Sequence, residues 1–183
     1  EEIPTNFFRR IIKNKKFQNK FVNVYCDYAN EVMKASRIQE QIRRYGTEKS
    51  ELIANSQLRW WGWSAKIPGY LYYKNNYINN VLTGIKSYLS QRPAFTLEHM
   101  VDYFQLEGKF HTLSLNIKGN GKIKINTIIP ELENGRWNGR YFSSVPVTIT
   151  AIPGKNSVFK SWSGDKVSEE ETIVINVDKD MEI

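Results

Sequence analysis

The chain has 183 residues, of which 40% are hydrophobic and 13% aromatic, and its formal net charge is +7. This composition is too apolar for a disordered chain, and no apolar run approaches the length of a membrane span. The single cysteine, Cys26, excludes an internal disulfide. The opening Glu1–Pro4 lacks the layout of a signal peptide, so we expect a cytoplasmic protein or a piece of a longer one.

The positive charge is concentrated in the first part of the chain. Residues 1–110 hold 17 basic and 10 acidic side chains, whereas residues 111–183 hold 9 of each. This asymmetry indicates two units of different character.

Helical spacing is present in the first part. Apolar residues recur at intervals of three and four from Phe17 to Val32, and Asn14 is placed to cap that helix. We expect Ser36 to begin a third helix that ends at Gly46, and Thr47 to begin another, because glycine favours helix ends.

A later helical pattern is the clearest in the chain. Ile78, Leu82, Ile85 and Leu89 define one face, and Pro93 is expected to end this helix and open a last one, because proline disfavours helix at the residue before it. Leu106–Gly108 closes the helical part.

Strand alternation begins after residue 110. Residues 112–118 and 122–126 alternate apolar and polar side chains around Gly119-Asn120-Gly121, which predicts a hairpin. Two further tight turns are predicted at Asn134-Gly135 and Asn138-Gly139. Later strands are expected at 147–151 and 172–177. We expect about five strands in one sheet, with a core filled by four large aromatic residues, Trp137, Phe142, Phe159 and Trp162.

Two segments carry resemblances to known families. The segment Val147–Asp165, VTITAIPGKNSVFKSWSGD, resembles the divergent internalin B-type repeat, in which an alternating strand is followed by Pro-Gly, an aromatic residue and Trp-Ser-Gly-Asp. The resemblance extends over the last two-fifths of the chain and implies a small β-grasp-like module of bacterial surface or secreted proteins. The family pattern has a further strand that ends in an aromatic residue, so we expect the last strand here to be cut short.

The helical part resembles the CotH-type protein kinases, named for a spore-coat protein. The match consists of FFRRIIKNKKFQNKFVNVYCDYAN near the start and YINNVLTGIKSYLSQRPAFTLEHMVDYFQLEG before the strands; residues 34–69 depart from the pattern. The resemblance implies an atypical kinase-like fold that uses ATP and a divalent metal. The aspartates that bind these groups in that family precede the matched segment, so no catalytic, cofactor-binding or metal-binding residue is assigned here. The residues themselves also contain no Gly-rich phosphate loop before a helix and no Asp-Phe-Gly.

Several groups of residues have both a structural and a functional interpretation. The basic run Arg9 to Lys20 could contact phosphate, nucleic acid or an acidic protein, but a solvated helix face is favoured. The cluster Trp60–Trp63 could stack on sugars or border a kinase cleft, with the filling of a core or an interface favoured. Glu98, His99 and Asp102 form a weak candidate metal site. Two single residues are assigned structural roles, Cys26 as a buried apolar residue and Asp165 as a turn residue rather than a calcium ligand.

These observations predict an α+β protein with a helical subdomain over 1–108 and a β module over 109–183. By resemblance, it is expected to be the non-catalytic C-terminal part of a CotH-like kinase from a bacterial secreted, surface or spore-coat protein. The helices would support the upstream kinase core, their partner, and the β module would act as a spacer or as a binding module for a protein or polysaccharide. The alternative is an adhesion or carbohydrate-associated module without kinase activity, and nucleic-acid binding ranks third because charge alone supports it. Whether the parent protein is an enzyme stays open.

Overall fold

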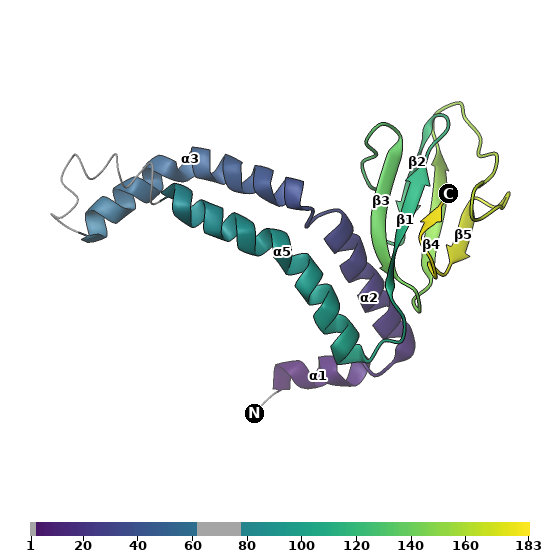
Figure 1. Cartoon of the computed structure of the whole chain (residues 1–183), viewed down its shortest axis with the longest axis horizontal. Coiled ribbons are helices and arrows are strands. Elements are labelled where there is room, and N and C mark those ends of the chain that lie inside the picture. The colour runs from purple at the N-terminus through teal and green to yellow at the C-terminus, as the bar shows by residue number, and fades with distance from the viewer. Residues whose placement is uncertain (1–2, 62–77) are drawn as a thin grey trace. The chain divides into compact units, whose positions relative to one another are not determined.

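The structure, a computed structural model, describes residues 3–61 and 78–183, with helices first and strands after them (Figure 1). The predicted α+β class is confirmed. The helices are α1 (Ile3–Ile11), α2 (Lys15–Asn30), α3 (Ala35–Trp61) and α5 (Ile78–Phe104). The strands are β1 (Phe110–Asn116), β2 (Gly121–Ile125), β3 (Arg136–Phe142), β4 (Val147–Pro153), β5 (Thr172–Ile175) and β6 (Met181–Glu182).

The chain divides into two compact units. One comprises Glu1–Glu31 with Leu97–Ile183, and the other comprises Val32–Thr96. The boundary predicted at residue 108 marks the change from helix to strand. The boundaries of the compact units lie elsewhere, after Glu31 and before Leu97. The reason is that Cys26 of α2 and Met100 of α5 share a buried core with the strands, so α1, α2 and the end of α5 belong to the sheet-containing unit.

The strands form two three-stranded sheets, not the single sheet that was expected. In one sheet β1 lies between antiparallel β3 and parallel β6, and in the other β4 lies between β2 and β5, both antiparallel to it. The predicted hairpin at Gly119-Asn120-Gly121 is therefore wrong, because β1 and β2 belong to different sheets. Both edges of β1 are occupied by β3 and β6. The glycine-rich segment takes the chain from the first sheet to the second, with Gly119 at φ +122°.

The two Asn-Gly pairs have different outcomes. Asn134-Gly135 is a tight turn as predicted, with φ values of 52° and 76°, and the flanking Glu133 and Arg136 exchange two backbone hydrogen bonds of 2.9 and 3.0 Å. Asn138-Gly139 is not a turn but lies inside β3. The glycine there is required because a β-carbon would collide with the Trp137 indole ring.

The interior of the β module contains the aromatic residues that the sequence indicated. Trp137, Phe142 and Trp162 are buried, and Phe159 is half-buried against that core. The sequence interpretation missed Tyr141, whose side chain is fully buried beside them.

Two expected helix boundaries do not exist. Gly46 and Thr47 lie within the single long helix α3, where Gly46 allows close approach to Leu82 of α5, the two helices running side by side in Figure 1. Pro93 lies inside α5 rather than between two helices. A proline inside a helix costs about 3 kcal/mol. The buried residues Leu97 and Met100 beyond it keep the chain helical, because tertiary packing can override local preference.

Two helical glycines of the unit Val32–Thr96 form a matched pair for a stability test. Glycine in a helix interior is less stable than alanine by about 0.5–1 kcal/mol. Gly84 has open space around its α-carbon, so Gly84→Ala should raise the free energy of unfolding by about that amount. A β-carbon at Gly46 would lie 2.5 Å from Leu82 Cδ1, so the gain from Gly46→Ala should be offset by displacement of that leucine. Urea unfolding followed by circular dichroism measures both; equal gains would contradict the close approach.

Candidate functional site

The most extensive polar site in the described chain surrounds the carboxyl group of Asp27 on α2. This side chain is fully buried. Its Oδ1 accepts hydrogen bonds from Asn126 Nδ2 (3.1 Å) and Tyr141 Oη (2.8 Å), and its Oδ2 accepts from Thr127 N (3.0 Å) and Thr127 Oγ1 (2.6 Å). All four partner atoms are donors, so the carboxyl group of Asp27 acts only as an acceptor here.

Two asparagines on the same helix hydrogen-bond to the backbone of the β module. Asn30 Nδ2 donates to the Arg140 carbonyl (2.9 Å), and Arg140 N donates back to Asn30 Oδ1 (2.9 Å), which satisfies one residue of strand β3 as a neighbouring strand would. Asn23 Nδ2 donates to the Pro146 carbonyl at 2.7 Å. The helix is therefore held on the sheets by directional bonds as well as by apolar packing.

A second buried acid extends this polar face. Glu31, which follows α2, accepts a hydrogen bond of 3.2 Å from Trp137 Nε1. Asn23, Asp27, Asn30 and Glu31 follow the spacing of one helix face. Sequence reasoning missed this polar face, because it assigned the core-facing stripe of the helix to its apolar and aromatic residues.

The Asp27 site holds its neighbours in their neutral forms. Burial, followed by the Asp27 charge, raises the pKa of the Cys26 thiol to about 12, and the same two causes in the same order raise the pKa of Tyr141 well above its usual value. A neutral phenol can donate to Asp27, whereas a thiol with this pKa is a poor nucleophile near neutral pH. The arrangement thus serves to attach a helix to a sheet.

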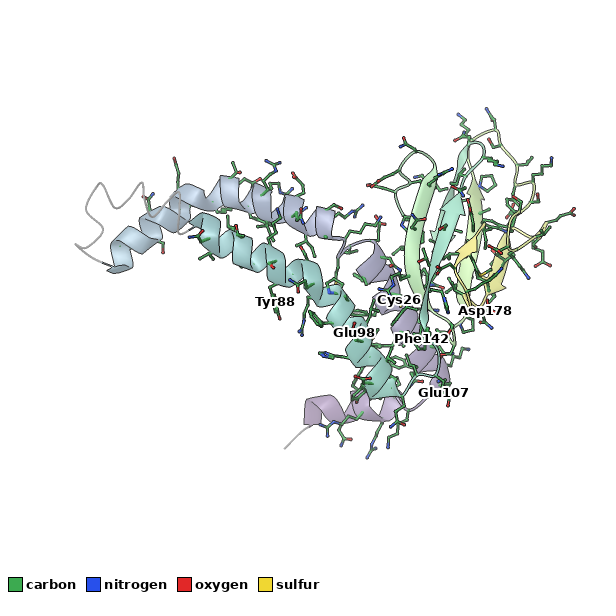
Figure 2. The ribbon with its side chains drawn as sticks, in the orientation of Figure 1. Cys26, Tyr88, Glu98, Glu107, Phe142 and Asp178 are labelled. Atoms are coloured by element: carbon green, nitrogen blue, oxygen red, sulfur yellow. The ribbon has the colours of Figure 1, made fainter. Side chains whose placement is uncertain are left out.

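The Cys26 thiol provides a direct probe of this attachment. Cys26 is fully buried, as predicted, and lies where α2 faces the strands (Figure 2). We expect the folded chain at neutral pH to react with a thiol reagent such as DTNB far more slowly than the chain in urea. Rapid stoichiometric labelling without denaturant, with the fold intact by circular dichroism, would contradict the docked position of α2.

Alkaline pH should weaken the fold through the same group. Because the folded-state pKa of Cys26 is about 12 and its ordinary value is 9.0, the folded chain holds this proton more tightly than the unfolded chain. The resulting stability is fully present below pH 9 and is lost as pH rises toward 12, with a limiting slope of about 1.4 kcal/mol per pH unit. Urea unfolding between pH 9 and 10 measures this loss, and Cys26→Ala should have a shallower slope; an unchanged slope would refute the assignment.

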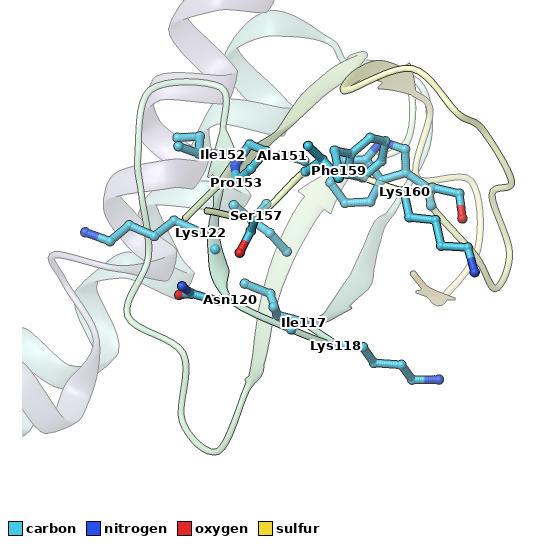
Figure 3. Close-up of a pocket in the computed structure, with 16 residues that line it drawn as sticks. Ile117, Lys118, Asn120, Lys122, Ala151, Ile152, Pro153, Ser157, Phe159 and Lys160 are labelled. Carbon is cyan, nitrogen blue, oxygen red and sulfur yellow. The ribbon is translucent and has the colours of Figure 1, made fainter. Parts of the chain in front are cut away.

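The β module carries an open groove of about 390 Å³ between the segment 117–123, the end of β4 and the segment 157–162. Ile117, Phe159 and Trp162 contribute to its apolar lining. Figure 3 shows the ammonium groups of Lys118 and Lys160 at one end of the groove, with that of Lys122 pointing away from them. Such a groove could accommodate an extended ligand that carries negative charge.

Exposed apolar side chains are present in the unit Val32–Thr96. On α5, Val81, Ile85 and Tyr88 are 41%, 43% and 60% exposed, and their spacing places them on one face. On α3, Tyr45 and Leu52 are also exposed, at 53% and 63%. The side chains of Trp60 and Trp61, and all of residues 62–77, lie outside the described residues, so the prediction for the Trp60–Trp63 cluster stays untested.

The remaining candidate residues from the sequence lie at the surface of the described chain. Glu98, His99 and Asp102 are exposed, and no group of three or more His, Cys, Asp or Glu within 3–61 and 78–183 is placed to hold a metal ion. Asp165 accepts hydrogen bonds from Lys179 Nζ (2.6 Å) and Glu182 N (2.9 Å), which fits the predicted turn role. The basic run Arg9 to Lys20 is exposed on α1 and α2.

None of the described helices is both long and apolar enough to cross a membrane. Comparisons with protein-family models, with curated proteins and with solved structures find no match to this chain.

Proposed function

We propose that this chain is the non-catalytic C-terminal part of a CotH-like atypical protein kinase, in which the helices support the kinase core and the β module is a fixed extension. The supporting observation is the apolar face of α5 formed by Val81, Ile85 and Tyr88. Exposed apolar faces of this kind mark surfaces that another body covers. In this proposal the partner is the upstream kinase core, and the protein functions at a bacterial surface, in a spore coat or after secretion.

The docking of α2 supports the second part of the proposal. A repeat that served as a flexible spacer would need only a covalent link to the helices. Here Asp27 and Asn30 bond to residues about one hundred positions later in the chain. The β module is therefore suited to hold a ligand or neighbour at a set distance from the helices that share its unit.

The support role is tested by co-purification with the region encoded immediately upstream in the parent reading frame. Ile85→Ser combined with Tyr88→Ser should reduce co-purification at least tenfold, whereas Lys86→Ser, also exposed on α5, should leave it unchanged. Kinase motifs rich in aspartate are expected in that upstream region. Equal capture by the parent chain, the double variant and the Lys86→Ser variant would reject the proposal. An upstream region that holds only repeats or a wall anchor would also reject it.

ATP binding gives an independent test of the non-catalytic assignment. The 183-residue chain is expected to show no saturable ATP binding by calorimetry, with or without magnesium. Micromolar affinity would contradict an active site that lies outside this chain.

A second candidate function, a polysaccharide-binding module, is favoured by the groove of the β module. Its lysines suit an acidic polysaccharide, and the lining of Ile117 and Phe159 suits the apolar faces of sugar rings. In a titration with an acidic cell-wall polysaccharide, Lys118→Ala with Lys160→Ala should weaken binding by tenfold or more. Lys86→Ala, which removes charge from α5, is the control.

A further inference from the structure

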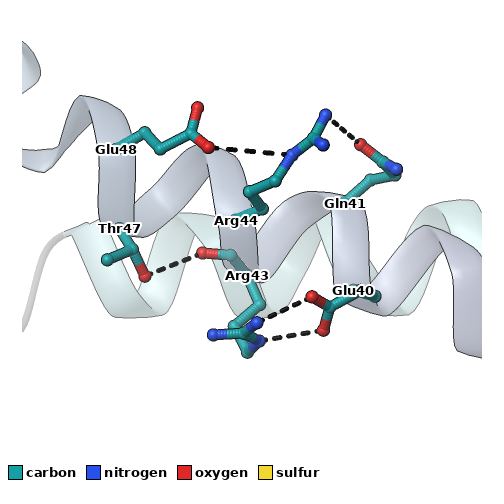
Figure 4. A network of polar contacts seen from close by, with 6 residues as sticks. All are labelled: Glu40, Gln41, Arg43, Arg44, Thr47 and Glu48. Atoms are coloured by element: carbon teal, nitrogen blue, oxygen red, sulfur yellow. Dashed lines mark hydrogen bonds and ion pairs between the residues drawn. The ribbon is translucent and has the colours of Figure 1, made fainter.

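The basic surface of α1 and α2 differs in charge pattern from the exposed surface of α3. Between Ile3 and Cys26 the sequence holds six basic residues and no acidic residue. On α3, by contrast, Arg43 contacts Glu40 at 2.6 Å and Arg44 lies 3.8 Å from Glu48, so opposite charges alternate (Figure 4). The solvated face of α3 mixes acidic and basic side chains, so a face of that kind does not account for a run of basic residues alone.

Helix electrostatics do not explain the run either. Arg9 and Arg10 lie in the last turn of α1, where cations are favourable. Lys15 and Lys16, however, begin α2, where the positive end of the helix dipole makes them unfavourable. A bound anion would reverse that cost.

Part of this basic run borders a hollow of about 550 Å³ between α1 and the end of α5, and Lys15, Lys16 and Lys20 follow outside its lining. Arg10 and Lys13 line it together with the amide side chains of Asn6, Gln18 and Gln105, and none of the described residues in its lining is acidic. Tyr103, 64% exposed, stands at its edge.

The hollow is built on packed elements. Phe8 of α1 contacts Phe21 of α2 edge to face, with ring centroids 5.6 Å apart, and Phe21 contacts Phe104 of α5 in the same way at 5.8 Å. The three helices that carry the cations and Tyr103 are thus held together by an aromatic cluster. Their polar groups are presented outward from this base.

We propose that this surface, defined by Arg10, Lys13, Lys15, Lys16, Lys20 and Tyr103, binds single-stranded nucleic acid without sequence preference. A cationic hollow can follow the phosphate backbone, and an exposed aromatic ring beside it gives a base a face on which to stack. The sequence supported nucleic acid by charge alone. The hollow and the exposed tyrosine are what the tertiary structure adds, and this inference is independent of the kinase assignment.

The test is fluorescence anisotropy of a labelled oligothymidylate titrated with the full chain at several salt concentrations. Five cations and about 0.7 released counterions per contact predict that affinity falls about a hundredfold between 50 and 200 mM salt. Arg10→Ala with Lys13→Ala should weaken binding and reduce the salt slope by about 1.4. Arg43→Ala with Arg44→Ala changes the net charge equally and should leave the slope unaltered.

Stacking is tested separately from charge. Tyr103→Ala, at an exposed position, should weaken oligothymidylate binding about fivefold or more while the salt slope and the melting temperature stay unchanged. Three outcomes would overturn the proposal: no binding at 50 mM salt, equal losses in the α3 control, or polyglutamate binding as tightly as the oligonucleotide. Equal binding to anionic phosphatidylglycerol vesicles, insensitive to Tyr103→Ala, would likewise overturn it.

Discussion

Asp27→Ala should lower the free energy of unfolding of the chain by about 3–5 kcal/mol, the largest loss expected from any polar residue described here. The carboxyl group satisfies donors from Asn126, Thr127 and Tyr141 in a site without solvent access. An alanine would leave these donors facing a small cavity. For a chain of this length, the loss corresponds to a fall in melting temperature of roughly 10–15 °C.

The matched variants separate charge from acceptor geometry. Asp27→Asn preserves size, but its amide N–H groups would face donors, so we expect a loss nearly as large as for alanine. Glu107→Ala removes an exposed carboxylate and should change stability by less than about 0.5 kcal/mol. Thermal melts followed by near-ultraviolet circular dichroism measure all three. A melting temperature for Asp27→Ala within about 1 °C of the parent would show that the site does not hold α2.

Labelling of Cys26 shows whether α2 detaches alone in the Asp27 variants. If the helix undocks before the sheets unfold, thiol labelling of Asp27→Ala should accelerate at temperatures where the β-sheet signal is unchanged. If labelling follows the global melt, α2 and the sheets form one cooperative unit. The two results distinguish local from global loss of the fold.

Trp162→Ala should destabilise the β module by about 3–5 kcal/mol. The indole is only 6% exposed, its Nε1 donates to the Glu170 carbonyl at 2.9 Å, and its ring lies 5.3 Å from that of Phe159. The backbone also pairs here, with Trp162 N donating to the Ser168 carbonyl at 2.7 Å. Alanine would remove the packing that closes the segment between β4 and β5.

Two further variants complete that experiment on the full chain. Trp162→Phe retains most of the buried area and loses the Nε1 hydrogen bond, so its cost should be clearly smaller than that of alanine. Val158→Ala alters a side chain that is 90% exposed in the same segment and should be nearly neutral. A thermal midpoint that hardly moves for Trp162→Ala would reject the view that the module is centred on this tryptophan.

The hydrogen bonds that attach α2 to the sheets also account for the candidate site around Asp27. Sequence reasoning assigned no catalytic residue, and the most buried polar cluster described here has a structural explanation in the attachment of α2. The groove of the β module and the hollow beside Tyr103 are both made from segments distant in sequence. Neither could be inferred from residue spacing, because their shape depends on how strands and helices meet.

Local chemistry by itself determined much of this protein. Asn14 accepts a hydrogen bond of 3.1 Å from Phe17 N as an N-cap, and Asn134-Gly135 turns with positive φ angles. The helix cap and the turn depend on neighbours a few residues away, and so does the alternation that marks the strands. Each of these features can therefore be predicted from the local sequence.

Only the tertiary structure decides which segments distant in sequence pack or pair with one another. Asp27 is satisfied in the interior by donors about one hundred residues later, and Gly139 stays in a strand because β3 pairs with β1, where Gly139 lies opposite Leu113. Gly46 stays inside a helix because Leu82 approaches it, and β1 and β2 separate because other strands occupy both edges of β1. At the two glycines a local preference worth about 1 kcal/mol or less is outweighed by packing and hydrogen bonding that only the folded chain supplies.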